Sequence, residues 1–170
     1  MDELIKEAKK GNPDAFTQLM QLQMQNMYKA ARALLDNDED IADAISETIL
    51  TCWEKIKQLK YEEYFRTWMT RILINKCNDI LRKKVNLFFT DEIPEIPSYD
   101  TRFENVEWKE ALNVLDKKYR LVIMLYYVEG FKTSEIAQIL DIPDSTVRSR
   151  LARGRERLVN EYDPKRRETV

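Results

Sequence analysis

The amino-acid sequence predicts an all-α protein in which two small helical domains are joined by an acidic, proline-containing linker. Apolar residues recur with a helical period in both halves, and no alternating, strand-like run is longer than a few residues. Two of the five prolines, Pro94 and Pro97, fall within Val85–Phe103, where they disfavour helix. The 170 residues are enough for two small domains. We expect a first domain at 1–85, a linker at 86–103, a helix-turn-helix domain at 104–162 and a basic C-terminal tail at 163–170.

Three helices are expected in the first domain. Asn12-Pro13 is a typical helix start, because the missing N–H of a proline costs nothing in the first turn. The cluster Asp36-Asn37-Asp38 interrupts the apolar period, and a second helix follows with Asp40 as its expected N-cap. A third helix is expected from about Glu63 to Lys84. The face opposite its apolar side chains carries Thr67, Arg71, Asn75, Asn78 and Arg82.

The second domain is expected to contain a helix-turn-helix. Helices resume at Glu104, and one of them ends at Gly130, a typical C-cap. Thr133 then caps a short helix, and Asp141-Ile142-Pro143 forms a tight turn before a longer, basic helix. The buried face of that helix is predicted to consist of Val147, Leu151 and Leu158. Gly154 is expected to weaken its end by up to ~1 kcal/mol of helix propensity.

The composition argues against an enzyme or a cofactor-binding protein. The chain has no histidine, which removes the commonest general base and the commonest metal ligand. It has only three glycines, so a glycine-rich phosphate loop is excluded. Neither Cys52 nor Cys77 lies in a metal-binding spacing. We therefore predict no catalytic residues, no metal and no cofactor.

Several features favour a location in the cytoplasm. The two cysteines lie inside apolar helical patterns, which is typical of reduced thiols. No apolar run approaches the ~18 residues of a membrane span. The N-terminal segment MDELIKEAKKGNPD lacks the apolar core of a signal peptide.

Basic charge is concentrated in two stretches, although the net charge is −2. Residues 66–84 carry six basic side chains against one acidic side chain, and residues 145–157 carry five against one. Residues 85–115, by contrast, have a net charge of −5. Two basic helices in an acidic protein indicate two binding sites for a polyanion. The alternative is that these are two solvated helix faces.

The second basic stretch points to DNA. A short helix, a tight turn and a longer basic helix match the geometry of a helix-turn-helix, whose second helix enters the major groove. Arginine there pairs bidentately with guanine. The cap, the turn, the buried stripe and the basic stripe all agree, so we favour DNA binding over an ordinary helical hairpin.

Both halves of the chain resemble one family, the bacterial sigma factors of the extracytoplasmic-function class. Residues 104–160 are similar to the promoter-reading region 4 of that family, through Glu135-Ile136-Ala137, Ile142-Pro143 and Thr146-Val147-Arg148-Ser149-Arg150-Leu151. The segment DIADAISETILTCW, starting at Asp40, is similar to region 2.2, which binds core RNA polymerase. The segment FRTWMTRILINKCNDILRKK, starting at Phe65, is similar to the −10-reading regions 2.3 and 2.4.

The resemblance implies three sets of site residues. Those expected to bind the polymerase clamp helices are Asp40, Asp43 and Glu47. Those expected to contact the −10 element are Tyr61, Tyr64, Arg66, Arg71, Asn75, Asn78 and Arg82. Those expected to contact the −35 element are Ser145, Thr146, Arg148, Ser149, Arg150 and Arg153. Trp68, which lies on the apolar stripe, is predicted to pack in the core rather than to stack on a base.

The function implied is that of an alternative sigma factor that directs promoter-specific transcription initiation. Its expected partners are core RNA polymerase (clamp helices and flap), promoter DNA (the −10 non-template strand and the −35 duplex), and an anti-sigma factor anchored in the membrane. The linker would thread the channel that later carries RNA. Two other readings stay open: a dimeric helix-turn-helix repressor or activator that acts without polymerase, and a helical adaptor whose basic faces bind acidic proteins.

Overall fold

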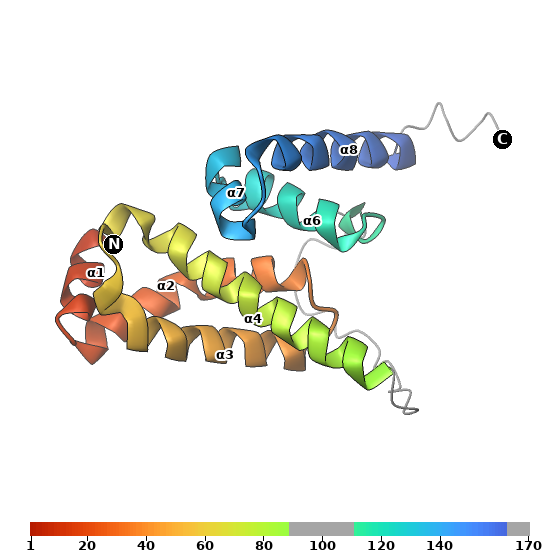
Figure 1. Ribbon diagram of the computed structural model, residues 1–170. Helices are drawn as coiled ribbons and strands as arrows, with labels where there is room; N and C mark the ends of the chain where they lie inside the picture. The colour runs from red at the N-terminus through yellow and green to blue at the C-terminus, as the bar shows by residue number, and fades with distance from the viewer. Residues whose placement is uncertain (89–110, 163–170) are drawn as a thin grey trace. The chain divides into compact units, whose positions relative to one another are not determined.

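The computed structural model describes residues 1–88 and 111–162 (Figure 1), and the regular structure within these ranges is helical throughout. The chain divides into two compact units, unit 1 within residues 1–97 and unit 2 within residues 98–170. The predicted fold class, two helical units with a helix-turn-helix in the second, is confirmed. The predicted tail at 163–170 lies outside the described residues.

Unit 1 is a bundle of four helices. Their bounds are α1 Asp2–Lys9, α2 Pro13–Arg32, α3 Asp38–Lys55 and α4 Phe65–Phe88, and two short 3₁₀ turns, Ile56–Gln58 and Glu62–Tyr64, join α3 to α4. Helix α3 runs along α4, α2 packs against both, and α1 packs against α2 (Figure 1). Fully buried apolar side chains from all four helices form the core, among them Ile5, Leu19, Ile41 and Leu73.

Helix α1 is an element that sequence periodicity did not predict. It is only eight residues long and buries just Ile5 and Ala8, too few positions to establish a helical period. Tertiary contacts hold it in place. It packs on α2, and Lys9 Nζ forms an ion pair with Glu62 Oε1 at 2.9 Å, which ties α1 to the turn before α4.

One predicted helix start in unit 1 is correct and one is wrong. At the start of α2, Asn12 Oδ1 accepts hydrogen bonds from the backbone N–H groups of Asp14 and Ala15, at 3.0 and 3.2 Å. Helix α3, however, is capped by Asn37 and not by Asp40. Asn37 Oδ1 accepts from the Asp40 N–H at 2.8 Å, so Asp40 is the third residue of the helix. The helix starts earlier because either residue is a good cap, and acidic Asp38 and Glu39 suit a first turn.

Helix α4 extends further than predicted. It reaches Phe88, so the predicted linker at 86–103 begins inside a helix at residues 86–88. In the sequence, only Pro94 and Pro97 marked the end of this helix. Prolines disfavour helix in their immediate neighbours, and these two lie beyond residue 88. The remainder of that linker lies in 89–110, outside the described residues.

Unit 2 contains the helix-turn-helix. Residues 111–113 are helical, and α6 spans Lys117–Ile123, a single π turn Met124–Val128, α7 Thr133–Leu140 and α8 Asp144–Tyr162. Helix α8 packs against both α6 and α7 (Figure 1). The turn between α7 and α8 contains Asp141 in the left-handed conformation, with a φ of 53°. Most of the helix predicted to begin at Glu104 lies outside the described residues.

The predicted cap of α7 is wrong by one residue. Thr133 is the first helical residue, and the N-cap is Lys132. The backbone N–H of Lys132 donates to Glu135 Oε2 at 2.7 Å, so Glu135 supplies the reciprocal half of a capping interaction. The Thr133 side chain instead lies near Asp144, the first residue of α8, and lowers its pKa, so the starts of the two helices are close together.

Gly154 lies at the close crossing of α8 and α6. The sequence predicted that it weakens the end of the helix, but α8 continues through it for two further turns. A Cβ atom at this position would lie 3.0 Å from Ile123 Cγ1 and 3.7 Å from Tyr119 Cβ. The missing side chain lets the two helices approach, and the tertiary contact outweighs the ~1 kcal/mol of helix propensity that glycine loses.

Gly154→Leu is expected to destabilise unit 2. The new side chain would overlap Ile123, and overpacking of this kind lowers the free energy of unfolding by about 1–3 kcal/mol. Ala152→Leu, at an exposed position of the same helix, is the matched control and is expected to change little. Urea unfolding followed by circular dichroism measures both variants. Equal midpoints for the two leucine variants would contradict the close crossing.

Candidate nucleic-acid and protein interfaces

Four polar residues of α4 form one row on its surface, which we call the α4 row: Arg71, Asn75, Asn78 and Arg82. Their spacing of three and four residues puts them on one face, as predicted. All are exposed except Asn78, which is half-buried, and Arg82 forms an ion pair with Asp79 at 3.2 Å. Thr67, predicted on the same face, is buried instead. The row offers two cations and two amides, which both donate and accept hydrogen bonds.

Two tyrosines lie immediately before α4. Tyr61 and Tyr64 are exposed, with ring centroids 6.0 Å apart in an edge-to-face arrangement. Exposed aromatic rings are platforms on which an unpaired base stacks. Arg66 is half-buried, and so is Trp68, whose ring lies 6.1 Å from that of Phe65.

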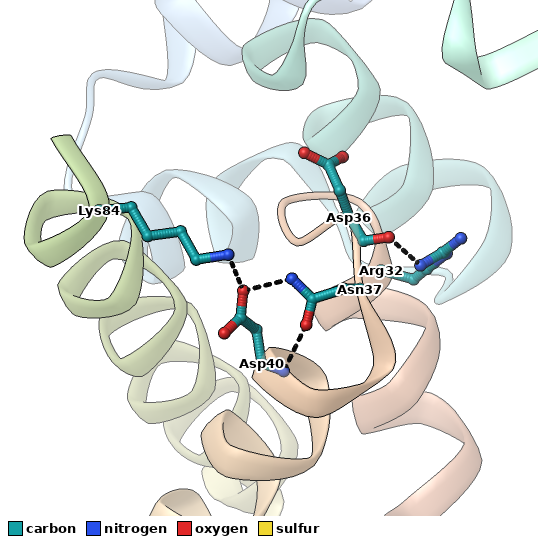
Figure 2. A network of polar contacts seen from close by, with 5 residues as sticks. All are labelled: Arg32, Asp36, Asn37, Asp40 and Lys84. Carbon is teal, nitrogen blue, oxygen red and sulfur yellow. Dashed lines mark hydrogen bonds and ion pairs between the residues drawn. The ribbon is translucent and has the colours of Figure 1, made fainter. Parts of the chain in front are cut away.

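The three carboxylates predicted to bind polymerase are not equivalent. Asp43 is exposed, and Glu47 is 63% exposed although it forms an ion pair with Lys76 of α4 at 3.2 Å. The Asp40 side chain is only 18% exposed and forms an ion pair with Lys84, near the C-terminal end of α4 (Figure 2). Of the three carboxylates, Asp43 and Glu47 are therefore the exposed ones.

An exposed leucine accompanies these carboxylates, which sequence reasoning missed. Leu50 is 64% exposed and lies three residues after Glu47 and seven after Asp43, so it shares their side of α3. We call these three residues the α3 face. The helical spacing from Glu47 could have identified Leu50. Trp53 is 39% exposed and packs on Phe16, with ring centroids 4.9 Å apart.

The first half of α8 carries five of the six predicted −35 residues. Ser145, Arg148 and Ser149 are exposed, while Thr146 and Arg150 are half-buried. Arg148 Nε donates to Asp144 Oδ2 at 2.5 Å, one helical turn away. The hydroxyl of Thr133 and the guanidinium of Arg148 hold the pKa of Asp144 below its usual value, so Asp144 is an anion at neutral pH.

The second half of α8 carries exposed arginines that also contact residues of their own unit. A hydrogen bond from Arg153 lowers the pKa of Tyr119 in α6 below its usual value. Arg157 lies over the Tyr119 ring, 4.7 Å from its centroid, and its Nη1 donates to Asp116 Oδ2 at 2.8 Å. Arg155 Nη1 donates to the hydroxyl of Tyr127 at 3.1 Å. The basic stripe predicted from the sequence thus divides into two halves. We call the first the outward half and the second, whose exposed arginines, Arg153 among them, also contact their own unit, the inward half.

Within the described ranges, no group of histidine, cysteine, aspartate or glutamate side chains is arranged to hold a metal ion. Cys52 and Cys77 are both free and buried, and burial raises the pKa of each thiol to about 12. None of the described helices is long and apolar enough to cross a membrane.

Comparison with known proteins identifies both units. The family model for sigma-70 region 2 matches residues 19–86, and the model for sigma-70 region 4 matches residues 106–158. The chain is 30% identical over 173 residues to the ECF RNA polymerase sigma factor SigW of Bacillus subtilis (strain 168), an alignment that covers 91% of this chain and 92% of SigW.

Two solved structures have a similar fold. CnrH, solved in complex with the cytosolic domain of CnrY, matches with a TM-score of 0.71 at 25% identity, covering 95% of this chain and 96% of CnrH. The sigma factor RpoE, solved with the anti-sigma factor NepR from Bartonella quintana, matches with a TM-score of 0.73 at 24% identity, covering 85% of this chain and 94% of RpoE.

Proposed function

The chain belongs to the sigma-70 family as an RNA polymerase sigma factor of the extracytoplasmic-function (ECF) class, and from this premise we propose which of its surfaces binds which partner. Unit 1 binds core RNA polymerase through the α3 face and captures the melted non-template −10 strand through the α4 row. Unit 2 reads the −35 duplex through the outward half of α8. Sigma factors are not enzymes, so the chain contributes recognition and no chemistry.

The α4 row is the observation that carries this proposal. It combines cations, which attract the phosphates, with amides, which pair with base edges, and exposed tyrosines lie at its N-terminal end. Such a surface suits a DNA single strand whose unpaired bases point toward the protein. A duplex-binding repressor needs only the helix-turn-helix, and a protein adaptor needs neither amides nor tyrosines, so both alternatives leave the α4 row without a role.

The α3 face supports polymerase binding. Asp43 and Glu47 are exposed carboxylates, and exposed Leu50 adds apolar area beside them. An apolar contact inside a charged rim is typical of protein interfaces. We assign the clamp helices of the polymerase as its occupant, and the flap as a contact of unit 2, by resemblance to the family.

Control by an anti-sigma factor completes the proposal. CnrH and RpoE, which share this fold, were each solved with a partner protein, and the partner of RpoE is an anti-sigma factor. We propose that a comparable inhibitor, anchored in the membrane, covers the α3 face and competes with polymerase in the cytoplasm. A pull-down is expected to recover polymerase or inhibitor, and a stable complex of all three would exclude competition.

Run-off transcription tests the proposed function as a whole. Core RNA polymerase with this chain, incubated with genomic fragments, is expected to start at defined sites that core polymerase alone does not use. The free chain is expected to bind duplex promoter DNA weakly, because each unit is small. Transcription that is identical with and without the chain would overturn the proposal.

Asn75→Ala is expected to alter −10 recognition alone. Asn75 is exposed in the middle of the α4 row, and loss of a base-reading amide costs about 1–3 kcal/mol of discrimination at one position. Open-complex formation on promoters with single −10 substitutions measures the change, while −35 preference stays unchanged. Gln25→Ala, exposed on α2, is the control. Unaltered −10 selectivity would leave Asn75 as a solvated residue.

A further inference from the structure

The C-terminal part of α4 is weakly anchored by apolar packing. The buried side chains of this helix end at Cys77. Among residues 78–85, whose side chains the structure describes, none is fully buried, and Ile80 and Leu81 are half-buried. Helical segments with little buried apolar surface open locally at low free-energy cost. Contacts other than core packing therefore matter more for this part of α4 than for the part before it.

An ion pair supplies one such contact. Lys84 Nζ of α4 contacts Asp40 Oδ2 in the first turn of α3 (Figure 2). The two side chains are 43% and 18% exposed, so the pair is partly shielded from solvent. Residues 40 and 84 are far apart in sequence, and the contact joins the end of α4 to the start of α3. A second pair, Lys76–Glu47, joins the same helices further from the end of α4, at 3.2 Å.

The Asp40 carboxylate is held in place by its own helix start. Asn37 Nδ2 donates to Asp40 Oδ2 at 2.7 Å, and Asn37 Oδ1 accepts from the Asp40 N–H at 2.8 Å (Figure 2). Arg32 Nη1 donates to the carbonyl oxygen of Asp36 at 2.8 Å and so fixes the preceding turn. The N-terminal position in α3 also favours a negative charge. Only Lys84 therefore loses side-chain freedom when the pair forms.

We propose that Asp40 is a positioning residue for the α4 row, acting through Lys84, and not a contact of polymerase. The inference rests on the proposed functions of α3 and α4. Asp40 is covered by Lys84, whereas Asp43 and Glu47 are exposed. Within the α4 row, Arg82 and Asn78 lie within six residues of Lys84, and Arg71 and Asn75 lie in the part of the helix anchored by the core. The ion pair therefore positions the C-terminal half of the α4 row, which consists of Asn78 and Arg82.

Hydrogen exchange of the free chain tests the anchoring. In Asp40→Asn and in Lys84→Met, amides of residues 80–88 are expected to exchange about two- to fivefold faster, as for loss of a partly exposed ion pair. Amides of residues 69–77 stay unchanged. The double variant is expected to match either single variant, because both remove the same contact. Lys84→Arg keeps the charge and is expected to restore protection.

The matched control is Glu47→Gln, which removes the other ion pair between these helices and is expected to leave residues 80–88 unchanged. Additive effects of Asp40→Asn and Lys84→Met, or unchanged exchange in both, would overturn the proposal. The free-chain experiment needs neither polymerase nor DNA, so it decides the anchoring even if the proposed function fails.

Binding assays then separate positioning from polymerase contact. Asp40→Asn and Lys84→Met are expected to bind core polymerase as the wild type does, and their holoenzymes to bind a −10 single strand about two- to fivefold more weakly. Asp43→Asn is expected to weaken binding to core polymerase and to leave binding of the −10 single strand unchanged. If Asp40→Asn weakens core binding as much as Asp43→Asn does, Asp40 is a polymerase contact and the inference is wrong. If Asp43→Asn leaves core binding unchanged, the assignment of the α3 face fails instead.

Discussion

The double variant Asp43→Lys with Glu47→Lys is expected to bind core RNA polymerase about a hundredfold more weakly than the wild type. Both carboxylates are exposed on the α3 face, beside Leu50. Reversing two charges places like charges opposite each other across the interface, which costs several kcal/mol. The loss should shrink as salt is added, because screening weakens the repulsion. Fluorescence anisotropy of the labelled chain, titrated with core polymerase, measures this affinity.

The control for this variant is a charge reversal elsewhere in unit 1. Glu3→Lys with Asp14→Lys changes the net charge equally at exposed positions on α1 and α2 and is expected to keep the wild-type affinity. Because Glu47→Lys also removes the ion pair with Lys76, circular dichroism must show an intact helical fold. Wild-type affinity in a folded Asp43/Glu47 double variant would exclude the α3 face as the polymerase site.

Arg148→Ala is expected to weaken −35 recognition by about 1–3 kcal/mol and to relax preference at one position, provided that its guanidinium pairs bidentately with guanine. Arg148 is exposed in the outward half of α8, and Asp144 holds its guanidinium beside the helix. A phosphate contact would instead weaken binding equally for all sequences and reduce the salt slope by about one. Holoenzyme binding to duplexes with single −35 substitutions, at several salt concentrations, distinguishes the two.

Arg153→Ala is the matched comparison on the same helix. The family resemblance assigned Arg153 to the −35 site; its side chain is exposed, but it also contacts Tyr119 of α6, whose pKa it lowers. We expect Arg153→Ala to leave −35 preference unchanged and to lower the stability of unit 2. The opposite result, a loss of selectivity in Arg153→Ala and none in Arg148→Ala, would show that the inward half of α8 faces the DNA.

Sequence patterns predicted the structure correctly where the prediction depends on a single helix. The α4 row could be predicted because residues three and four positions apart share a helix face whatever the helix packs against. The helix-turn-helix was predictable for the same reason, since its turn and buried stripe lie within one short segment. Errors of one to three residues at the helix starts arose where neighbouring residues, such as Asn37 and Asp40, are both good caps.

The sequence by itself determined the all-α class, the two helical units and the faces of α4 and α8, because helical periodicity and turn chemistry are properties of short segments. Only the tertiary structure decided which charges are available to a partner. Asp40 and Asp43 look alike in the sequence, yet Lys84 covers one and leaves the other exposed. Arg153, although exposed, also contacts Tyr119 of α6. Such pairs join residues far apart in the chain, and the energy of a charge depends on what folding brings within a few ångströms of it.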